Sequence, residues 1–259
     1  MKKFRKEGNI ILFALFYFLF ISLIVAIFIS LTLMSETYQR VQTAAETGAR
    51  TRALSVNIPL KEQYGIIETF RPDSSEGYNP NYKEPEYSFS PTPGYDHPIL
   101  SPTSSQYKAS LASANTAAKQ MVISSIGDSL GTNEAGDKIV DLKSENICIQ
   151  VLPLPAGDSI TKRGKLNFTC TATVNGKPVT ITANNVEVYG YNHSLNTSGK
   201  IKVYNVVFVG VAYEDRHFFY NLLQRLINGD DESKWNDPPV RGTYAIGYPQ
   251  IDSCTTDEC

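Results

Sequence analysis

Ser129 lies in the tetrapeptide Gly127-Asp-Ser-Leu130, the place where this chain best suggests a nucleophilic serine. A serine attacks an ester carbonyl only when a general base lies within hydrogen-bond reach and a third group orients that base. Histidine with a nearby carboxylate can supply both, and the chain offers Glu214-Asp-Arg-His217. The reaction to consider is therefore acyl transfer through Ser129 and His217.

The tetrapeptide matches the signature of GDSL esterases, in which the motif ends the first strand of an α/β domain and Asp-x-x-His supplies the base. Here glutamate replaces that aspartate, the motif closes a helical stretch, and only 129 residues follow Leu130. The expected geometry is missing, which favours a chance match. We expect no enzyme and no catalytic residues. An esterase remains the third alternative and would require activity that disappears in Ser129→Ala.

Metal and cofactor sites are not expected. The acidic runs Asp230-Asp-Glu232 and Asp257-Glu258 lack the ligand spacing of a calcium loop, and His97, His193 and His217 have no partner at ligand spacing. The net charge is -2, and nucleic-acid binding normally needs a concentrated basic face. We therefore expect no metal, no cofactor and no nucleic-acid partner.

The four cysteines Cys148, Cys170, Cys254 and Cys259 permit three disulfide connectivities. The simplest joins Cys148 to Cys170 and Cys254 to Cys259. Strand parity counts against the first pair, because Cys170 falls on an apolar strand face whereas Cys148 shares its parity with the polar residues Asn146 and Gln150. A bulge or another pairing would therefore be required. Structural zinc is the competing interpretation, but no C-x-x-C pair is present.

An apolar stretch near the N-terminus predicts a transmembrane helix. No charged side chain occurs from Gly8 to Ser35, and Ile10–Leu33 is almost wholly apolar. As a helix these residues would extend about 36 Å, enough to cross a hydrocarbon core of about 30 Å. The basic residues gather before the stretch, so we expect a cytoplasmic leader at 1–9, a transmembrane helix at 10–33 and an extracytoplasmic remainder.

A cleaved secretory signal is the alternative for this stretch. Signal peptides carry an apolar region of about 7–15 residues and a small-residue cleavage site. The run here is longer, and Leu31–Glu36 offers no A-x-A-like site. The sequence therefore favours a retained anchor.

The helix is predicted to continue through 34–58. This extension lacks proline before Pro59 and carries a small-residue face formed by Val41, Ala45, Gly48, Ala49 and Ala53, with Ala44 beside it. Small side chains let another helix or a sheet approach closely, although alanine also simply favours helix. Whether this helix-packing face makes contacts within the chain or between molecules stays open.

Prolines and tyrosines dominate the segment 59–106. Eight of the chain's fourteen prolines lie between Pro59 and Pro102. Proline removes a backbone donor and fixes φ, which excludes a long helix. We expect an extended connection whose tyrosines lie against the folded domain.

Residues 107–259 are predicted to form an extracytoplasmic α+β domain. Leu111, Ala114, Ala118, Met121, Val122 and Ile126 recur at helical spacing within Tyr107–Leu130. Alternation then predicts strands at 147–151, 165–174 and 179–183, the last two joined by a hairpin turn at Asn175-Gly176. The strand expected at Ile201–Tyr213 is apolar on both faces and therefore central.

The remaining patterns predict an amphipathic helix at Phe218–Ile227, capped by Asp215, and a short strand at Tyr244–Tyr248. The expected fold is α+β: a long N-terminal transmembrane helix followed by a helix and an antiparallel sheet of about four strands, a pilin-like layout.

The first fifty residues carry a family resemblance. Lys6-Glu-Gly-Asn-Ile-Ile-Leu-Phe-Ala-Leu, the apolar span, and Tyr38-Gln-Arg-Val-Gln-Thr-Ala-Ala-Glu-Thr-Gly-Ala-Arg50 resemble the N-terminus of TadE/TadG-like proteins of tight-adherence (Flp) pilus systems. The resemblance implies a pseudopilin or accessory component in the bacterial cytoplasmic membrane. Its partners would be membrane lipid and other pilus or secretion-apparatus proteins, or further copies through the N-terminal helix.

The resemblance also implies a possible leader-peptidase site after Gly8, with Asn9 as the new N-terminus. Processed pilins carry a glutamate at the fifth mature position, where this chain has Phe13. This departure favours a protein that keeps its anchor. The alternative function is a membrane-tethered extracytoplasmic binding or sensory domain, and neighbouring genes for a secretion ATPase and a prepilin peptidase would favour assembly.

Overall fold

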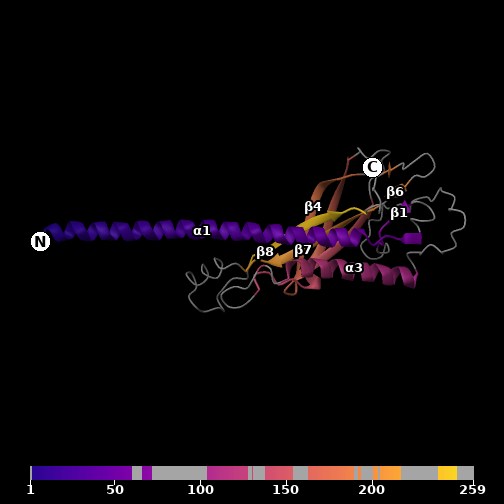
Figure 1. The fold of residues 1–259 in the computed structure, drawn as a ribbon, viewed down its shortest axis with the longest axis horizontal. Helices are drawn as coiled ribbons and strands as arrows, with labels where there is room; N and C mark the ends of the chain where they lie inside the picture. Colours follow the sequence, from indigo (N-terminus) through magenta and orange to yellow (C-terminus); the bar gives the residue numbers. More distant parts are fainter. Residues whose placement is uncertain are drawn as a thin grey trace. The chain divides into compact units, whose positions relative to one another are not determined.

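The computed structural model describes residues 2–59, 66–71, 104–127, 130, 138–153, 163–189, 192–193, 201–203, 205–216 and 239–249. Within these residues the fold is α+β (Figure 1). The chain divides into two compact units. Unit 1 comprises Met1–Arg40, Asp128–Asp141 and Glu214–Pro239, and unit 2 comprises Val41–Gly127, Leu142–Tyr213 and Val240–Cys259.

Helix α1 spans Lys2–Ala53 and contributes residues to both units. The predicted apolar helix and its continuation are thus one element, although the helix ends five residues before the predicted limit of 58. It ends because Val56 forms an antiparallel bridge with Thr69, which takes the chain out of helical geometry. Just after the end of α1, Leu54 N still donates a helical hydrogen bond to Arg50 O at 3.0 Å.

Helix α3 spans Ser105–Ile126. The Ser104 side chain accepts a hydrogen bond from Tyr107 N at 3.1 Å and so caps the first turn. At the other end Gly127 has a φ of 45°, which ends the helix before the predicted Leu130. The predicted apolar stripe is buried except for Met121, which is 41% exposed at the edge of the stripe.

Strand β2 (Ile147–Pro153) pairs antiparallel with β7 (Asn205–Glu214), and β8 (Val240–Gly247) lies on the other side of β7. Residues 205–213 of β7 are all buried. The prediction of a central strand that is apolar on both faces is therefore confirmed for β7, which has a neighbour on each edge and buries both faces. The predicted start at Ile201 is wrong, because Ile201–Val203 form the separate strand β6 of another sheet.

Strands β3 (Arg163–Val174) and β4 (Lys177–Tyr189) form the predicted hairpin. Asn175 and Gly176 both have positive φ, 49° and 75°, as a two-residue type I′ turn requires. The predicted alternation is confirmed by burial: Phe168, Ala172 and Val174 are buried, while the intervening polar residues from 165 to 171 are exposed.

The four main predicted strands do not form one sheet. The hairpin β3–β4 is a separate two-stranded sheet, and it packs on β2-β7-β8 through a shared core in which the rings of Phe168 and Phe208 stack at 4.7 Å. The physical reason lies in β7, because a strand that is apolar on both faces needs a covering layer on each side. The hairpin supplies one of these layers.

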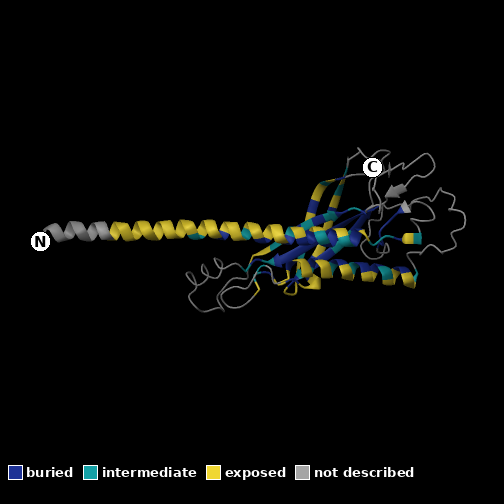
Figure 2. Cartoon of the chain, viewed as in Figure 1, coloured by how far each residue is buried: buried dark blue, intermediate teal, exposed yellow. Residues whose placement is uncertain are grey.

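Helix α1 supplies part of the other layer. The even-numbered β7 residues Val206, Phe208 and Ala212 belong to the core shared with the hairpin. Side chains alternate along a strand, so Val207, Val209 and Val211 point to the opposite face. On β8 the corresponding odd-numbered residues face α1, as the contact of Gly247 with the helix shows. In Figure 2 this part of α1 alternates between buried, intermediate and exposed residues, and the strands of the sheet are largely buried.

The remaining described elements are short. β1 (Ile66–Ile67) pairs in parallel with β6 (Ile201–Val203), which pairs antiparallel with β5 (Asn192–His193), and η2 is a 3-10 turn at Ser144–Asn146. The predicted helix at Phe218–Ile227 and most of the connection 59–106 lie outside the described residues.

In unit 1 the described residues around 214–216 are held by backbone bonds. Asp215 N donates to Pro239 O at 3.1 Å, and Arg216 N donates to Ile139 O at 3.3 Å. Glu214 and Arg216 form an ion pair at 2.8 Å. Asp215, the predicted cap, is buried, but the helix it was predicted to cap is outside the described part of the chain.

Candidate functional site

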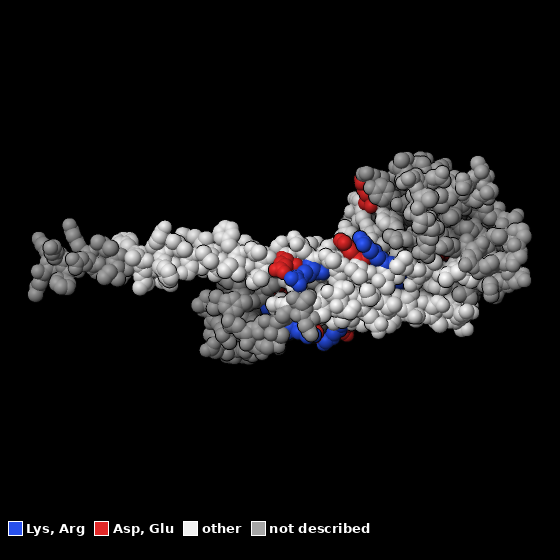
Figure 3. Space-filling view, viewed as in Figure 1, with Lys and Arg blue, Asp and Glu red and all other residues white. Residues whose placement is uncertain are grey.

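The apolar stretch of α1 presents its large side chains outward. Every large apolar residue from Leu12 to Leu33 is exposed, from 36% at Ile24 to 74% at Phe13. No charged residue occurs along this surface, which is drawn in white in Figure 3. By length and composition Leu12–Ala53 is the one helix among the described residues that could span a membrane. Seventeen large apolar side chains are exposed along this stretch, and so extensive an apolar surface is unfavourable in water.

The serine and threonine hydroxyl groups in this stretch are satisfied within the helix. Ser22 Oγ donates to Phe18 O at 2.7 Å, Ser30 Oγ to Ala26 O at 2.8 Å, and Thr32 Oγ1 to Phe28 O at 2.9 Å. An unsatisfied polar group costs several kcal/mol in hydrocarbon, so internal bonding of this kind is what a lipid-exposed helix requires. The stretch is therefore chemically compatible with a lipid surrounding.

Charge returns immediately after the apolar stretch. Glu36 and Arg40, one helical turn apart, form an ion pair at 2.6 Å with both side chains more than 40% exposed. Exposed pairs at this spacing contribute only about 0.3–0.5 kcal/mol. The pair instead marks the position at which the helix surface changes from apolar to polar.

The small-residue face of α1 packs inside unit 2. Val41, Ala45, Ala49 and Ala53 are 0% exposed. On the side of α3, a β-carbon added at Gly48 would overlap Val122 and lie 3.2 Å from Ala118 O. Of the two alternatives left open by the sequence, the structure therefore places this face in contacts within the chain.

Strand β8 holds the other side of the same face. A β-carbon added at Gly247 would overlap Ala49 O and lie 3.1 Å from the Ala53 β-carbon. Gln42 adds polar contacts, because its Nε2 donates to Tyr244 O at 3.0 Å and its Oε1 accepts from Thr243 Oγ1. Glycine and alanine are needed here because backbones come this close only when side chains are small.

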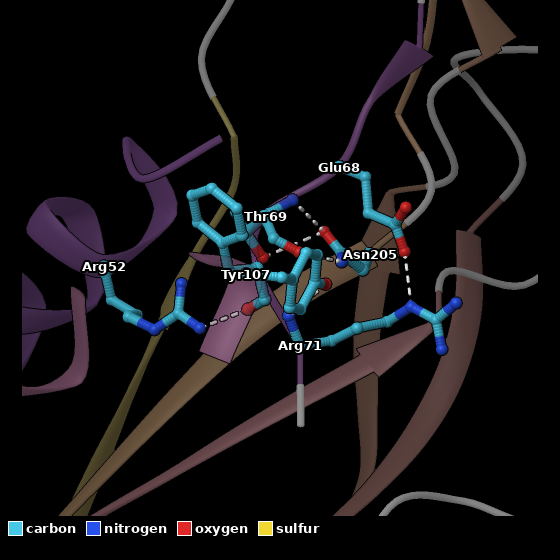
Figure 4. A network of polar contacts seen from close by, with 7 residues as sticks. Arg52, Glu68, Thr69, Arg71, Tyr107 and Asn205 are labelled. Carbon is cyan, nitrogen blue, oxygen red and sulfur yellow. Dashed lines mark hydrogen bonds and ion pairs between the residues drawn. The ribbon is translucent and has the colours of Figure 1, made fainter. Parts of the chain in front are cut away.

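A buried polar network lies at the end of α1 (Figure 4). Arg52 is fully buried in the last turn of the helix, where its Nε donates to Asn115 Oδ1 at 2.7 Å and its Nη2 donates to Phe70 O. Burial lowers the pKa of Arg52 to about 10. The guanidinium thus joins α1, α3 and the segment Ile66–Arg71, which we call the threaded segment.

Tyr107 and an ion pair fix the end of the threaded segment. Arg71 N donates to the Tyr107 hydroxyl at 2.9 Å, and Arg71 Nε pairs with Glu68 Oε1 at 2.6 Å. The rings of Phe70 and Tyr107 meet edge to face at 5.0 Å. Burial raises the pKa of Tyr107 to about 12, so the hydroxyl is neutral at physiological pH.

Asn205, the first residue of β7, binds the middle of the threaded segment. Its Oδ1 accepts from Thr69 N at 3.0 Å and from Thr69 Oγ1 at 3.1 Å, and its Nδ2 donates to Thr69 O at 3.0 Å. The amide side chain imitates a neighbouring strand and satisfies buried backbone groups that would otherwise cost about 1–3 kcal/mol each. These contacts are structural and include no exposed nucleophile.

Sequence reasoning missed the threaded segment, because 59–106 was treated as one extended connection. A usable signal was present: no proline occurs between Pro59 and Pro72, and the apolar pair Ile66-Ile67 lies in that interval. The buried partners themselves have no sequence signature, since Arg52, Tyr107 and Asn205 come from three distant places in the chain.

Cys148 and Cys170 are joined by a disulfide with their Cα atoms 5.9 Å apart. The parity argument against this pair was wrong. Cys148 does share a strand face with Asn146 and Gln150, but that face turns toward β3. There Asn146 Nδ2 donates to Thr173 O at 2.9 Å and Gln150 Oε1 accepts from Thr169 N at 3.2 Å. Cys254 and Cys259 lie outside the described residues.

The other candidate positions are described only in part. Gly8 and Asn9 lie within the backbone of α1, while Asp128, Ser129, His97 and His217 fall outside the described residues. Among the residues that the structure describes, no group of three or more His, Cys, Asp or Glu side chains could hold a metal ion.

Comparison with known proteins gives no relative. No family model matches the sequence, and neither a curated protein nor a solved structure is significantly similar to it.

Proposed function

We propose that this chain is a membrane-anchored structural or accessory component of a Tad-type pilus or secretion apparatus, pseudopilin-like in layout, that acts through protein contacts. It would reside in the bacterial cytoplasmic membrane as a single-pass protein with its N-terminus inside and the cysteine-bearing part outside. The observation that carries the anchoring is the exposed apolar surface of α1 from Leu12 to Leu33.

Three further features support the proposal. The same helix continues as Val41–Ala53 and packs its small-residue face on an antiparallel sheet, which fits a pilin-like layout. The Cys148–Cys170 disulfide fits an oxidising compartment outside the cytoplasm. The resemblance of the first fifty residues to TadE/TadG-like proteins is the reason for proposing a Tad-type pilus or secretion apparatus.

The packing of α1 limits where partners bind. Its small-residue face is occupied inside the chain, so contacts with other proteins would use the opposite side of the helix, where Thr43, Glu46 and Arg50 are exposed. The membrane-spanning stretch would provide further contacts with other helices in the bilayer.

The anchoring is tested by extracting membranes with alkaline carbonate and by adding protease to intact wall-stripped cells. We expect the full-length protein to stay with the membranes and its cysteine-bearing part to be digested. Release by carbonate or full protection from protease would overturn the proposed topology. Mass spectrometry of the mature N-terminus then decides between processing, with a start at Asn9, and a permanent anchor.

The assembly role is tested separately by co-purification from membranes dissolved in mild detergent. We expect pilus or secretion-apparatus proteins to be recovered with the wild type, and in smaller amounts with Glu46→Arg/Arg50→Glu, whose exposed side chains can change without disturbing the core. Recovery of no such protein with the wild type, while the anchoring tests succeed, would favour the binding or sensory alternative.

A further inference from the structure

The hairpin β3–β4 is attached to the β2-β7-β8 sheet without a backbone ladder in the described residues. Beside β3, strand β2 makes side-chain bonds instead: Gln150 to Thr169 N and Asn146 to Thr173 O. The hairpin and the sheet also share an apolar core, and a disulfide joins Cys148 on β2 to Cys170 on β3. Side-chain bonds and apolar contact are reversible, whereas the disulfide is covalent.

The central strand leaves room for this disulfide. Gly210 of β7 lies directly opposite Cys148 in the ladder. A β-carbon at position 210 would lie 2.9 Å from Cys148 Sγ, 3.0 Å from Cys170 Sγ and 2.9 Å from Ile181 Cδ1. Glycine weakens the interior of a strand, so its place in the most buried strand indicates that the space is needed.

We propose that the Cys148–Cys170 bond is a redox-dependent lock that holds the β3–β4 hairpin on the sheet, and that the domain becomes fully closed only after the cysteines leave the cytoplasm. Locking is an exchange reaction: the two thiols give two electrons and two protons to the disulfide of a thiol-disulfide oxidoreductase, which leaves as a dithiol. The extracytoplasmic location on which this timing rests is that of the proposed function.

Unlocking would expose a defined surface. The hairpin covers Val206, Phe208 and Ala212 of β7, and Phe168 of the hairpin stacks on Phe208. The opposite face of β7 remains covered by the α1 layer. In the dithiol form, therefore, the hairpin opens more often than the sheet, and the apolar β7 face that it uncovers makes the open form unsuited to assembly.

Hydrogen exchange on the full-length protein in detergent tests the lock without reference to its location. The double variant Cys148→Ser/Cys170→Ser is compared with the wild type, and Cys254→Ser/Cys259→Ser is the matched control. We expect amide exchange in β3 and β4 to rise on the order of 100-fold in the first variant, the effect of losing a cross-link that closes a loop of this size. Amides of β7 and α3 should change much less.

Two outcomes would overturn the proposal. An equal rise in β3, β4, β7 and α3 would show that the bond stabilises the whole domain rather than the hairpin, and no rise would show that the shared core holds the hairpin alone. Wild-type protein treated with a dithiol reductant should reproduce the first variant, while the control variant without reductant should match the untreated wild type. Hydrogen exchange is measured on the purified protein and does not depend on its location. The proposed lock can therefore be overturned while the membrane topology is confirmed, and the topology can be overturned while the lock is confirmed.

Discussion

Gly247 of β8 lies against the backbone of Ala49 in α1 so closely that a β-carbon at position 247 would overlap the Ala49 carbonyl oxygen. A strand and a helix meet here with no side chain between them. The contact determines how near the helix comes to the sheet, and it accounts for the row of alanines on the helix.

Substituting Gly247→Ala should therefore destabilise the domain, because either the helix or the strand must move. We expect a loss of about 1–3 kcal/mol, the usual cost of overpacking, measured by urea unfolding of the detergent-solubilised protein. Gly176→Ala is a useful comparison, since nothing lies within 4 Å of its added β-carbon and the cost there comes from its φ of 75° alone. A Gly247→Ala variant with the stability of the wild type would contradict this close contact.

The triple substitution Ala45→Leu/Ala49→Leu/Ala53→Leu should disrupt the folding of unit 2 and not only its assembly. All three alanines are 0% exposed, so nine added carbon atoms have no space. Limited proteolysis should show rapid cleavage in the triple variant. The control Thr43→Leu/Glu46→Leu alters exposed positions of the same helix and should remain resistant. Equal resistance of both variants would mean that the face is not packed within the chain.

The Tyr107 hydroxyl predicts a specific dependence of stability on alkaline pH. Its folded pKa is raised from 10.0 to about 12, so its contribution is fully present below pH 10 and is lost as the pH rises through 12. The stability advantage of the wild type over Tyr107→Phe should therefore fall over this window by up to about 3 kcal/mol. The quantity to measure is the difference in free energy of unfolding between the two proteins, because the lysines and the other tyrosines titrate in both.

Arg52 acts in the opposite direction over a similar range. Its folded pKa is lowered from 12.5 to about 10, so the folded state loses its proton first and stability rises as the pH increases above 10. In Tyr107→Phe this rise is no longer offset by the tyrosine. If the stability advantage of the wild type over Tyr107→Phe stayed constant from pH 9 to pH 12, the burial of Tyr107 would be contradicted.

A charge in the middle of the apolar stretch should impair membrane insertion. Ile21→Arg places a guanidinium near the centre of the helix, where insertion costs about 2.5–3.5 kcal/mol. We expect a larger fraction of this variant in the carbonate-soluble fraction. Tyr38→Arg, beyond the apolar stretch and 45% exposed, is the matched control and should stay with the membrane. Equal extraction of both variants would mean that the stretch is not in lipid.

Short-range patterns in the sequence were sufficient for several elements. The absence of charge from Gly8 to Ser35 predicts α1, and the Asn175-Gly176 pair predicts the turn of the hairpin, because each depends on neighbouring residues alone. The two apolar faces of β7 likewise predict a central strand. Hydrophobic periodicity and turn-forming residues are local properties, so they can be recognised in the sequence without knowledge of the fold.

Which surfaces meet is evident only in the folded chain. Cys148 looked wrongly placed because its polar neighbours implied solvent, whereas they bind the backbone of β3. The alanine face was open to either kind of contact until β8 and α3 were seen to cover it. The threaded segment is held by Arg52, Tyr107 and Asn205, residues far apart along the chain. Contacts of this kind depend on distance in space and carry no periodicity. Local patterns therefore predict most of the long elements, whereas the partners of each element follow only from the folded chain.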